Sequence, residues 1–204
     1  MDDGGRFGPG DVRFFDRTAG LYDLAMPAAP ADAVRAALAE ARRPVELVVD
    51  LAGGTGRATA ALDAPDDPEV VVVDASAEML GAARAGVSRV RGDAARLPLS
   101  PADGGRRGVD AVVVADALHH VPEGLNALAE AARALEPGGV LVVRDFDPTT
   151  LRGGAVAGAE AALQMGSTFR TPSAVCELLA DVGLRPTPLS EGWVYTVVGR
   201  KPTW

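Results

Sequence analysis

The stretch of sequence that decides the fold is Val48-Val49-Asp50-Leu51-Ala52-Gly53-Gly54-Thr55-Gly56-Arg57. Apolar, β-branched residues lead into closely spaced glycines, a pattern typical of a β-strand that ends in a tight turn before a helix. Glycine allows positive φ angles and lets the backbone approach a ligand closely, and the first turn of a helix offers free N–H groups. The stretch therefore predicts a nucleotide-binding loop, although a tight strand-to-helix turn without a ligand would show the same pattern.

Similar apolar runs recur along the chain, at Val45–Val49, Val70–Val73, Val109–Val114 and Val140–Val143. Ala-rich stretches separate these runs, and Gly, Pro or Asp residues border them. Continuous apolar strands are buried on both faces, as in a parallel sheet that is covered by helices on either side. We therefore predict an α/β protein with a doubly wound, mostly parallel sheet and helices on both faces.

Two helices are predicted between and after these strands. The first spans 123–135 and is stopped by Pro137-Gly138-Gly139, which turns the chain into the next strand. Its apolar stripe consists of Leu125, Leu128, Ala129, Ala132 and Leu135. The second begins at Thr171-Pro172 and ends at Gly183, with a stripe made of Val175, Leu178, Leu179 and Val182.

The end of the chain predicts a β-hairpin. Two strand candidates, 184–189 and 193–198, are joined by Ser190-Glu191-Gly192. A hairpin that closes a parallel sheet adds one strand antiparallel to the others. We predict a single domain over 1–204, in which 1–44 form an N-terminal helical cap, 45–145 the cofactor-binding core, and 146–204 the acceptor-side helices and the hairpin.

Composition narrows the class of protein further. The 204 residues carry 28 acidic and 20 basic side chains, a net charge of −8, which disfavours a protein that tracks nucleic-acid backbones. No apolar run is long enough to span a bilayer and the acidic start carries no apolar signal, so we expect a cytoplasmic protein. Cys176 is the only cysteine, which excludes an intramolecular disulfide and a zinc site made of several thiolates. We predict no metal site.

The acidic composition, in which Lys201 is the only lysine, also suggests a salt-loving source. A fold indifferent to KCl concentration would contradict that hypothesis.

An acidic residue follows the second predicted strand. Asp74 lies at the end of 70–73, and in open α/β sheets ligands bind at the carboxyl ends of the strands, where such an acid can accept both ribose hydroxyls. The dinucleotide fingerprint G-x-G-x-x-G needs a third glycine, and Gly54-Thr55-Gly56 is instead followed by Ala58 and Thr59. An adenosyl ligand is therefore favoured over NAD(P), whose oxidoreductases remain the alternative.

These residues resemble the class I S-adenosylmethionine-dependent methyltransferases, whose sheet is Rossmann-like. Their motif (D/E)-x-G-x-G-x-G stands here as Asp50-Leu51-Ala52-Gly53-Gly54-Thr55-Gly56, with Ala52 in place of the first glycine. Further landmarks follow in order at Asp74, Gly92-Asp93-Ala94, the fourth strand Val109–Asp116 and the turn Leu135–Gly139. The resemblance implies S-adenosylmethionine as cofactor and these contacts to it: Asp50, Ala52, Gly53, Gly54, Gly56, Asp74, Ala75, Met79, Asp93, Ala94 and Ala115.

A finer resemblance is to the small-molecule branch that includes the ubiquinone and menaquinone biosynthesis C-methyltransferases. Phe14–Asp23 is similar to the F-x-x-x-A-x-x-Y-D element of that branch, and Asp116–Pro122 is similar to a segment that follows the fourth strand in it. The resemblance implies that Tyr22 and Arg17 close over the cofactor. It also implies methyl transfer to O, N or C of a small-molecule acceptor. We expect a monomer or a homodimer. A non-catalytic adenosyl-binding domain would share the same cofactor residues.

Candidate catalytic residues follow the fourth strand. His119 and His120 are the only histidines, and an imidazole titrates near neutral pH, so either could act as a base on the acceptor. Asp116 and Asp145 are competing candidates, and a structural role for the histidines remains the alternative. Residues of the late segments could line the acceptor site or simply form core: Met26, Phe146, Met165, Phe169, Trp193 and Tyr195.

Overall fold

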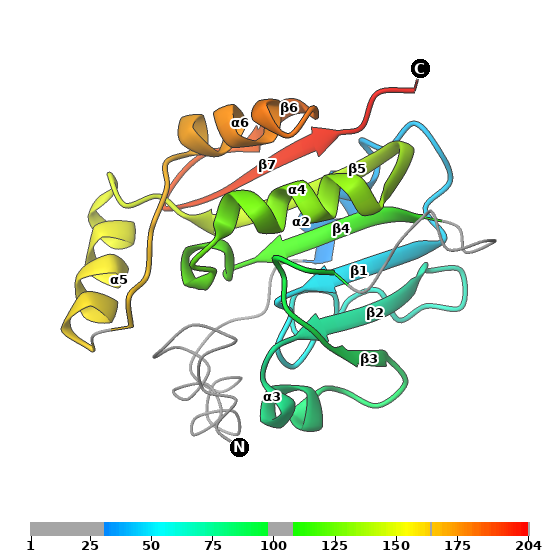
Figure 1. Ribbon diagram of the computed structural model, residues 1–204, viewed down its shortest axis with the longest axis horizontal. Helices are drawn as coiled ribbons and strands as arrows, with labels where there is room; N and C mark the ends of the chain where they lie inside the picture. Colours follow the sequence, from blue (N-terminus) through cyan, green and yellow to red (C-terminus); the bar gives the residue numbers. More distant parts are fainter. Residues whose placement is uncertain (1–30, 98–107, 164, 204) are drawn as a thin grey trace.

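The computed structural model describes residues 31–97, 108–163 and 165–203. Within this part of the chain one sheet runs in the order β3-β2-β1-β4-β5-β7-β6 (Figure 1). Its strands are β1 (Leu47–Leu51), β2 (Glu69–Asp74), β3 (Ser88–Arg91), β4 (Val109–Ala115), β5 (Leu135–Phe146), β6 (Arg185–Ser190) and β7 (Val194–Arg200). Residues 1–30 of the predicted N-terminal cap, with Arg17, Tyr22 and Met26, lie outside the described residues, whereas its remainder, 31–44, is described and includes a helix.

The predicted direction of the strands is confirmed. β1 pairs in parallel with β2 and β4, and β3 and β5 extend the parallel set on either side. β7 is antiparallel to both β5 and β6. β6 forms one edge of the sheet, where Pro186 and Pro188 are tolerated because a proline in an outer strand need not remove a ladder hydrogen bond.

Helices cover both faces of the sheet, as predicted (Figure 1). Alternate side chains of each strand point to opposite faces, so two apolar layers form. One layer joins residues such as Val48 and Val113 to α2 (Ala31–Leu38) and to Leu80 of α3 (Ala77–Ala82). The other joins residues such as Val49 and Val112 to α4 (Gly124–Ala134) and α6 (Pro172–Asp181).

Both ends of α6 match the prediction closely, and the two hairpin strands, β6 and β7, begin within one residue of the predicted positions. The Thr171 hydroxyl caps α6 by accepting a hydrogen bond from the Ala174 N–H, and Pro172 occupies the first turn. Val175 and Leu179 are fully buried. Gly183 follows the helix with a φ of 80°, the left-handed conformation that favours glycine after a helix end.

Three expectations about local structure were wrong. The glycine loop is not followed by a regular helix, because residues 57–62 form successive turns and Pro65 soon follows. In the region of α4 the predicted stripe is correct at Leu128, Ala132 and Leu135, which are buried, but wrong at Leu125, which is 45% exposed, and at the exposed Ala129. Ala127 and Ala131 belong to the buried face instead. The helix is thus rotated so that its small residues meet the sheet.

The third correction concerns the turn before the fifth strand. β5 begins at Leu135, which pairs with Val109, and the ladder resumes at Val140 opposite Ala111 after an irregularity. Pro137-Gly138-Gly139 therefore forms a bulge within the strand instead of a turn before it. A Cβ on Gly139 would lie 2.6 Å from the Asp110 carbonyl oxygen, so only glycine fits there.

One helix lies at the end of the sheet. α5 (Leu151–Ala162) is found beyond the carboxyl ends of β1 and β4, near the 3₁₀ helix η1 (Leu118–His120) that follows β4 (Figure 1). The Thr150 hydroxyl caps α5 by accepting a hydrogen bond from the Gly153 N–H, and a Cβ on Gly153 would lie 1.9 Å from the Asp147 carbonyl oxygen. The loops after β1, β2 and β4 therefore share one end of the sheet with α5.

Candidate functional site

The glycine loop after β1 is held to the acid at the end of β2. The Gly54 N–H donates a hydrogen bond to Asp74 Oδ2 at 2.8 Å, and the Ser76 N–H donates to Asp74 Oδ1 at 2.8 Å. Ser76 in turn caps α3 by accepting a hydrogen bond from the Met79 N–H. Each carboxylate oxygen has a second lone pair, so Asp74 can accept further hydrogen bonds from a bound molecule while it orders both loops.

The loop has no room for side chains. A Cβ on Gly53 would lie 2.5 Å from Asp50 Cγ, and one on Gly54 would lie 2.7 Å from Met79 Cε. Gly54 and Gly56 have φ angles of 57° and 76°. Ala52 also has a positive φ, 52°, which explains why a glycine is the usual residue at this position of the motif.

Asp50 is completely buried beneath this loop. Its Oδ2 accepts a 2.7 Å hydrogen bond from the Thr59 hydroxyl, whereas Oδ1 has no hydrogen-bond partner among the described residues. Burial raises the pKa of Asp50 to about 6, against the effect of the Thr59 hydrogen bond, and the negative charge of Asp74 adds to the rise. An orphaned carboxylate oxygen beneath a glycine loop fits a ligand that carries a hydrogen-bond donor or a positive charge.

The segments after β2 and β3 lie next to this loop. Gly92 N–H donates to the Asp74 carbonyl at 3.0 Å, which joins the ends of the two strands. Asp93 Oδ1 accepts a hydrogen bond from the Ala95 N–H at 2.9 Å, which forms an Asx turn. The other predicted cofactor contacts in and around these segments differ in exposure: Met79 is buried, and Ala75, Ala94 and Ala115 are half-buried.

Asp116 occupies the end of β4 in a strained conformation, with a φ of 53°. Its Oδ1 pairs with the Arg144 guanidinium of β5, and its Oδ2 lies 3.6 Å from the Arg57 guanidinium of the glycine loop. Burial raises the pKa of Asp116, and the two guanidinium groups oppose that shift. These contacts link the glycine loop to β4 and β5. The two arginines were not among the predicted site residues.

The two histidines lie in η1, directly after β4, where they meet a glutamate of α5. His119 is buried, its Nδ1 lies 2.6 Å from Asp145 Oδ1, and its Nε2 lies 3.5 Å from Glu160 Oε1. His120 Nε2 lies 3.9 Å from the same Glu160 oxygen, and His120 Nδ1 lies 3.3 Å from the Ser167 hydroxyl. The structure therefore brings together His119, His120 and Asp145, which were predicted, with Glu160, which was not.

The charges around His119 oppose the effect of its burial. Burial alone lowers the pKa of an imidazole, but the carboxylates of Asp145 and Glu160 outweigh it and raise the pKa of His119 to about 9. The same contact lowers the pKa of Glu160, although burial acts the other way. At neutral pH this imidazole is therefore a hydrogen-bond donor at both nitrogens, which favours a positioning role over that of a base.

Aromatic side chains surround this cluster. The Phe169 ring stacks on His119 at 4.4 Å between centroids, and the Phe146 ring meets His119 edge-on at 5.8 Å. Trp193 stacks on Phe146 and is 39% exposed. By contrast, Tyr195 is fully buried and donates to the Arg170 carbonyl, so it belongs to the core, and Met165 is also buried.

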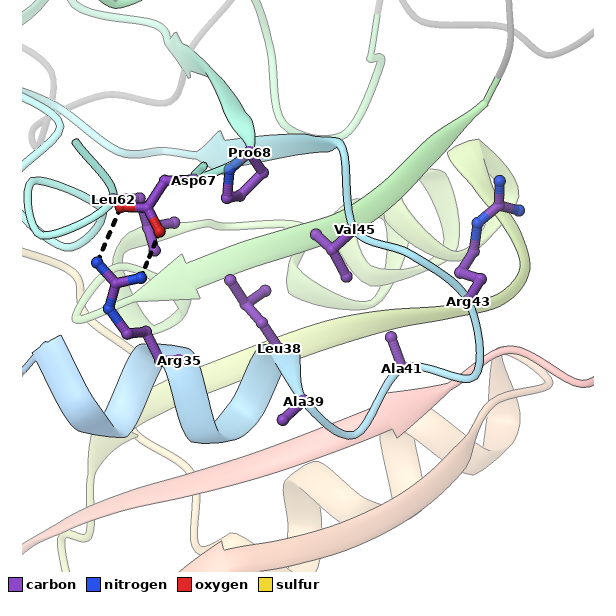
Figure 2. Close-up of a pocket in the computed structure, with 9 residues that line it drawn as sticks. All are labelled: Arg35, Leu38, Ala39, Ala41, Arg43, Val45, Leu62, Asp67 and Pro68. Carbon is purple, nitrogen blue, oxygen red and sulfur yellow. Dashed lines mark hydrogen bonds and ion pairs between the residues drawn. The ribbon is translucent and has the colours of Figure 1, made fainter. Parts of the chain in front are cut away.

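A shallow groove lies elsewhere, between α2 and the segment before β2 (Figure 2). Figure 2 shows Arg35 and Asp67 pointing toward one another, and Arg35 Nη2 donates to Asp67 Oδ2 at 2.8 Å. Arg43, at the far side of the groove, pairs with Asp110. Val45 and Pro68 precede β1 and β2, so the groove lies at the amino ends of the strands, away from the site described above.

The fold and this site together define an adenosyl-binding, Rossmann-like domain, and comparison with known proteins identifies its type. Residues 49–143 match the family model described as a methyltransferase domain. Over this range, which is just under half of its length, the chain matches a methyltransferase domain, and its sequence resembles the class I S-adenosylmethionine-dependent methyltransferases. The matched range begins within β1 and ends within β5, so it covers the glycine loop, Asp74 and the histidines.

Two curated relatives show which methyltransferases this chain is similar to. A demethylmenaquinone methyltransferase of Beutenbergia cavernae is 42% identical over 107 residues, which cover 51% of this chain and 42% of that protein. A ubiquinone/menaquinone biosynthesis C-methyltransferase of a Caulobacter species is 34% identical over 154 residues, which cover 65% of this chain and 58% of that protein. The chain thus spans about half the length of the curated relatives it matches.

A solved structure shows the same fold. An S-adenosylmethionine-dependent methyltransferase of Thermotoga maritima superimposes with a TM-score of 0.75 at 22% identity, covering 93% of this chain and 99% of that chain. These comparisons support S-adenosylmethionine as the cofactor, as predicted, and do not favour the NAD(P) alternative. In the part of the chain that is described, no helix has the length and apolar character needed to cross a membrane.

Proposed function

We propose that this protein transfers a methyl group from S-adenosylmethionine to a ring carbon of a small hydroquinone. The observation that carries the proposal is the junction of the glycine loop with Asp74, where Gly54 and Ser76 both donate to one carboxylate beside the orphaned Oδ1 of Asp50. The named activities of the two curated relatives support the choice of acceptor.

The cofactor role of each residue follows from its position. Bound S-adenosylmethionine supplies an activated methyl group, so the protein has mainly to position donor and acceptor. Asp74 accepts the ribose hydroxyls from its position at the carboxyl end of β2. Asp50 holds the loop and faces the methionine amino end. Asp93 meets the adenine amino group with the oxygen that is not used in the Ala95 turn.

In our proposal the acceptor lies beside the two histidines that follow β4. Phe146, Phe169 and Trp193 provide aromatic surface beside His119 and Glu160, a combination suited to a flat ring that carries hydroxyl groups. Loss of a hydroxyl proton raises the electron density of the neighbouring ring carbon. Polar groups that face the hydroxyl therefore promote attack by that carbon.

Competing functions predict different results. A non-catalytic adenosyl-binding domain would keep every cofactor contact but show no turnover. A nucleic-acid methyltransferase is disfavoured because the chain carries a net charge of −8. We therefore retain a small-molecule acceptor.

The test is an anaerobic turnover assay with S-adenosylmethionine carrying a deuterated methyl group. Reduced benzoquinone, reduced naphthoquinone, simple phenols and amines serve as acceptors, and mass spectrometry locates the label. We expect the label on a ring carbon of a hydroquinone, strong loss of turnover in Asp74→Asn, and none in Glu69→Gln, which changes an exposed acid at the opposite end of β2. Labelled oxygen or nitrogen would refute the choice of acceptor. Binding of the cofactor without any turnover would refute the proposed activity.

A further inference from the structure

Three side chains from two segments converge at the acceptor-side end of the sheet. His119 and His120 belong to η1, and Glu160 belongs to α5, and we call them the His119–His120–Glu160 cluster. One potential ligand atom of each residue lies within 4.8 Å of those of the other two. Two imidazoles and a carboxylate are the donor set of many transition-metal centres.

Both imidazoles are oriented so that the same type of nitrogen faces Glu160. His119 Nδ1 is engaged by Asp145 at 2.6 Å, and His120 Nδ1 lies 3.3 Å from the Ser167 hydroxyl. Their Nε2 atoms are left to face Glu160 Oε1, at 3.5 Å and 3.9 Å. A carboxylate or hydroxyl behind each ligating histidine is the arrangement that fixes the ring in metal centres.

The spacing also suits a small ion. Tetrahedral zinc has bonds of about 2.0–2.1 Å to nitrogen and oxygen, which place neighbouring ligand atoms about 3.4 Å apart. The two Nε2–Oε1 separations of 3.5 Å and 3.9 Å are close to that edge. Glu160 Oε1 faces the two imidazoles, whereas Glu160 Oε2 is buried and has no hydrogen-bond partner among the described residues, so one carboxylate oxygen is available to a further ligand.

We propose that the His119–His120–Glu160 cluster binds one divalent transition-metal ion of the Zn²⁺ type, and that His119 releases its Nε2 proton to solvent when the ion binds. The donor set disfavours Mg²⁺, which prefers carboxylates, phosphates and water. Three protein ligands leave a coordination position open, as in catalytic zinc sites. Asp145 is a positioning residue in this proposal, because it touches His119 and not the ion.

A second consequence rests on the proposed function. An ion at this site would lie beside Phe169, where we place the acceptor ring, and a divalent cation stabilises the deprotonated form of a hydroxyl next to it. Metal binding itself depends only on the side-chain geometry. The two proposals can therefore fail separately.

The test is calorimetric titration of tag-free, chelator-treated protein with ZnCl₂ and, separately, with MgCl₂. CoCl₂ provides a spectroscopic probe, since four-coordinate cobalt absorbs far more strongly in the visible than the hydrated ion. His120→Ala and Glu160→Gln each remove one ligand from a half-buried position, and Asp145→Asn changes the residue behind His119. Glu69→Gln is the matched control, because it removes a charge at the other end of the sheet.

We expect one Zn²⁺ per chain and affinity at least about tenfold lower in His120→Ala, Glu160→Gln and Asp145→Asn, with the control unchanged. The variants should keep the thermal shift that S-adenosylhomocysteine gives the unaltered protein, which shows that they are folded and that the cofactor site is intact. No saturable 1:1 binding of Zn²⁺, equal affinity in Glu160→Gln, or equal affinity for Mg²⁺ would overturn the proposal.

Discussion

The charge of Asp50 makes the stability of the unliganded protein depend on pH. The carboxyl is completely buried, and burial raises its pKa from 3.8 to about 6. Because the folded state binds the proton more tightly than the unfolded state, Asp50 contributes stability that is fully present below about pH 4 and is lost as pH rises through about 6. A shift of about 2.2 units corresponds to about 3 kcal/mol in total.

The variant Asp50→Asn isolates this effect. Asparagine keeps an oxygen that can accept the Thr59 hydrogen bond but carries no titrating proton. Unfolding in urea should be measured without ligand between about pH 5.2 and pH 8, above the isoelectric point near 4.8. From about pH 5.2 to pH 8 the free energy of unfolding of the unaltered protein should fall by about 1 kcal/mol relative to that of the variant. This is the part of the roughly 3 kcal/mol contribution of Asp50 that is still present at about pH 5.2.

His119 also acts within this window, but equally in both proteins. Its pKa is raised from 6.5 to about 9, so its contribution to stability falls from about pH 6.5 upward in the unaltered protein and in the variant alike, and the difference between the two reports Asp50. A difference between the two proteins that is flat from about pH 5.2 to pH 8, or that grows in favour of the unaltered protein as pH rises, would refute the buried-charge account of Asp50.

Three further substitutions test the loop and the core. Gly54→Ala places a Cβ 2.7 Å from Met79 Cε at a φ of 57°. It should therefore lower the free energy of unfolding by about 1–2 kcal/mol and weaken cofactor binding in a titration. The control is Gly86→Ala, where φ is 87° and no atom lies within 4 Å of the added Cβ, so only stability should change. Ala52→Gly relieves a positive φ and should raise the free energy of unfolding by about 0.5–1 kcal/mol, since the gain exceeds the added chain entropy. Leu128→Ala empties a fully buried position and should cost about 2–5 kcal/mol in urea unfolding.

Each of these expectations has a clear contrary result. Equal loss of cofactor affinity in Gly54→Ala and Gly86→Ala would mean that the glycine loop does not approach the ligand. A destabilised Ala52→Gly would mean that the positive φ at this position carries no strain. A Leu128→Ala variant within about 0.5 kcal/mol of the unaltered protein would contradict the placement of α4 on the sheet.

Much of the fold is visible in the sequence because its central strands are buried on both faces. β1, β2 and β4 read as continuous valine-rich runs, and the caps and breakers of α6 are local signals at Thr171, Pro172 and Gly183. β3 is different, since Ser88–Arg91 is a largely exposed edge strand with no apolar run. The bulge inside β5 was also missed, because its register depends on the pairing with β4 and not on local residues.

The site divides in the same way. The glycine loop follows β1 directly and Asp74 is the last residue of β2. Because the two strands are neighbours and parallel, locating them in the sequence also locates these residues at the same end of the sheet. Glu160 lies forty positions after His120 in a helix of small residues, and nothing in its neighbours marks it. Arg144 is hidden in an apolar strand, and only the sheet brings it to Asp116. The signal that could have found Arg144 is the presence of a charge in a buried run.

The central claim is that the loop after β1 and the acid after β2 bind an adenosyl cofactor. The most direct test is thermal unfolding with S-adenosylmethionine, S-adenosylhomocysteine, NAD and NADP, in low and in high salt. A ligand at about 100 times its Kd adds about 2.7 kcal/mol, so both adenosyl ligands should raise Tm by roughly 5–10 °C while the dinucleotides leave it unchanged. No shift with either adenosyl ligand, or a shift with NAD alone, would contradict the account.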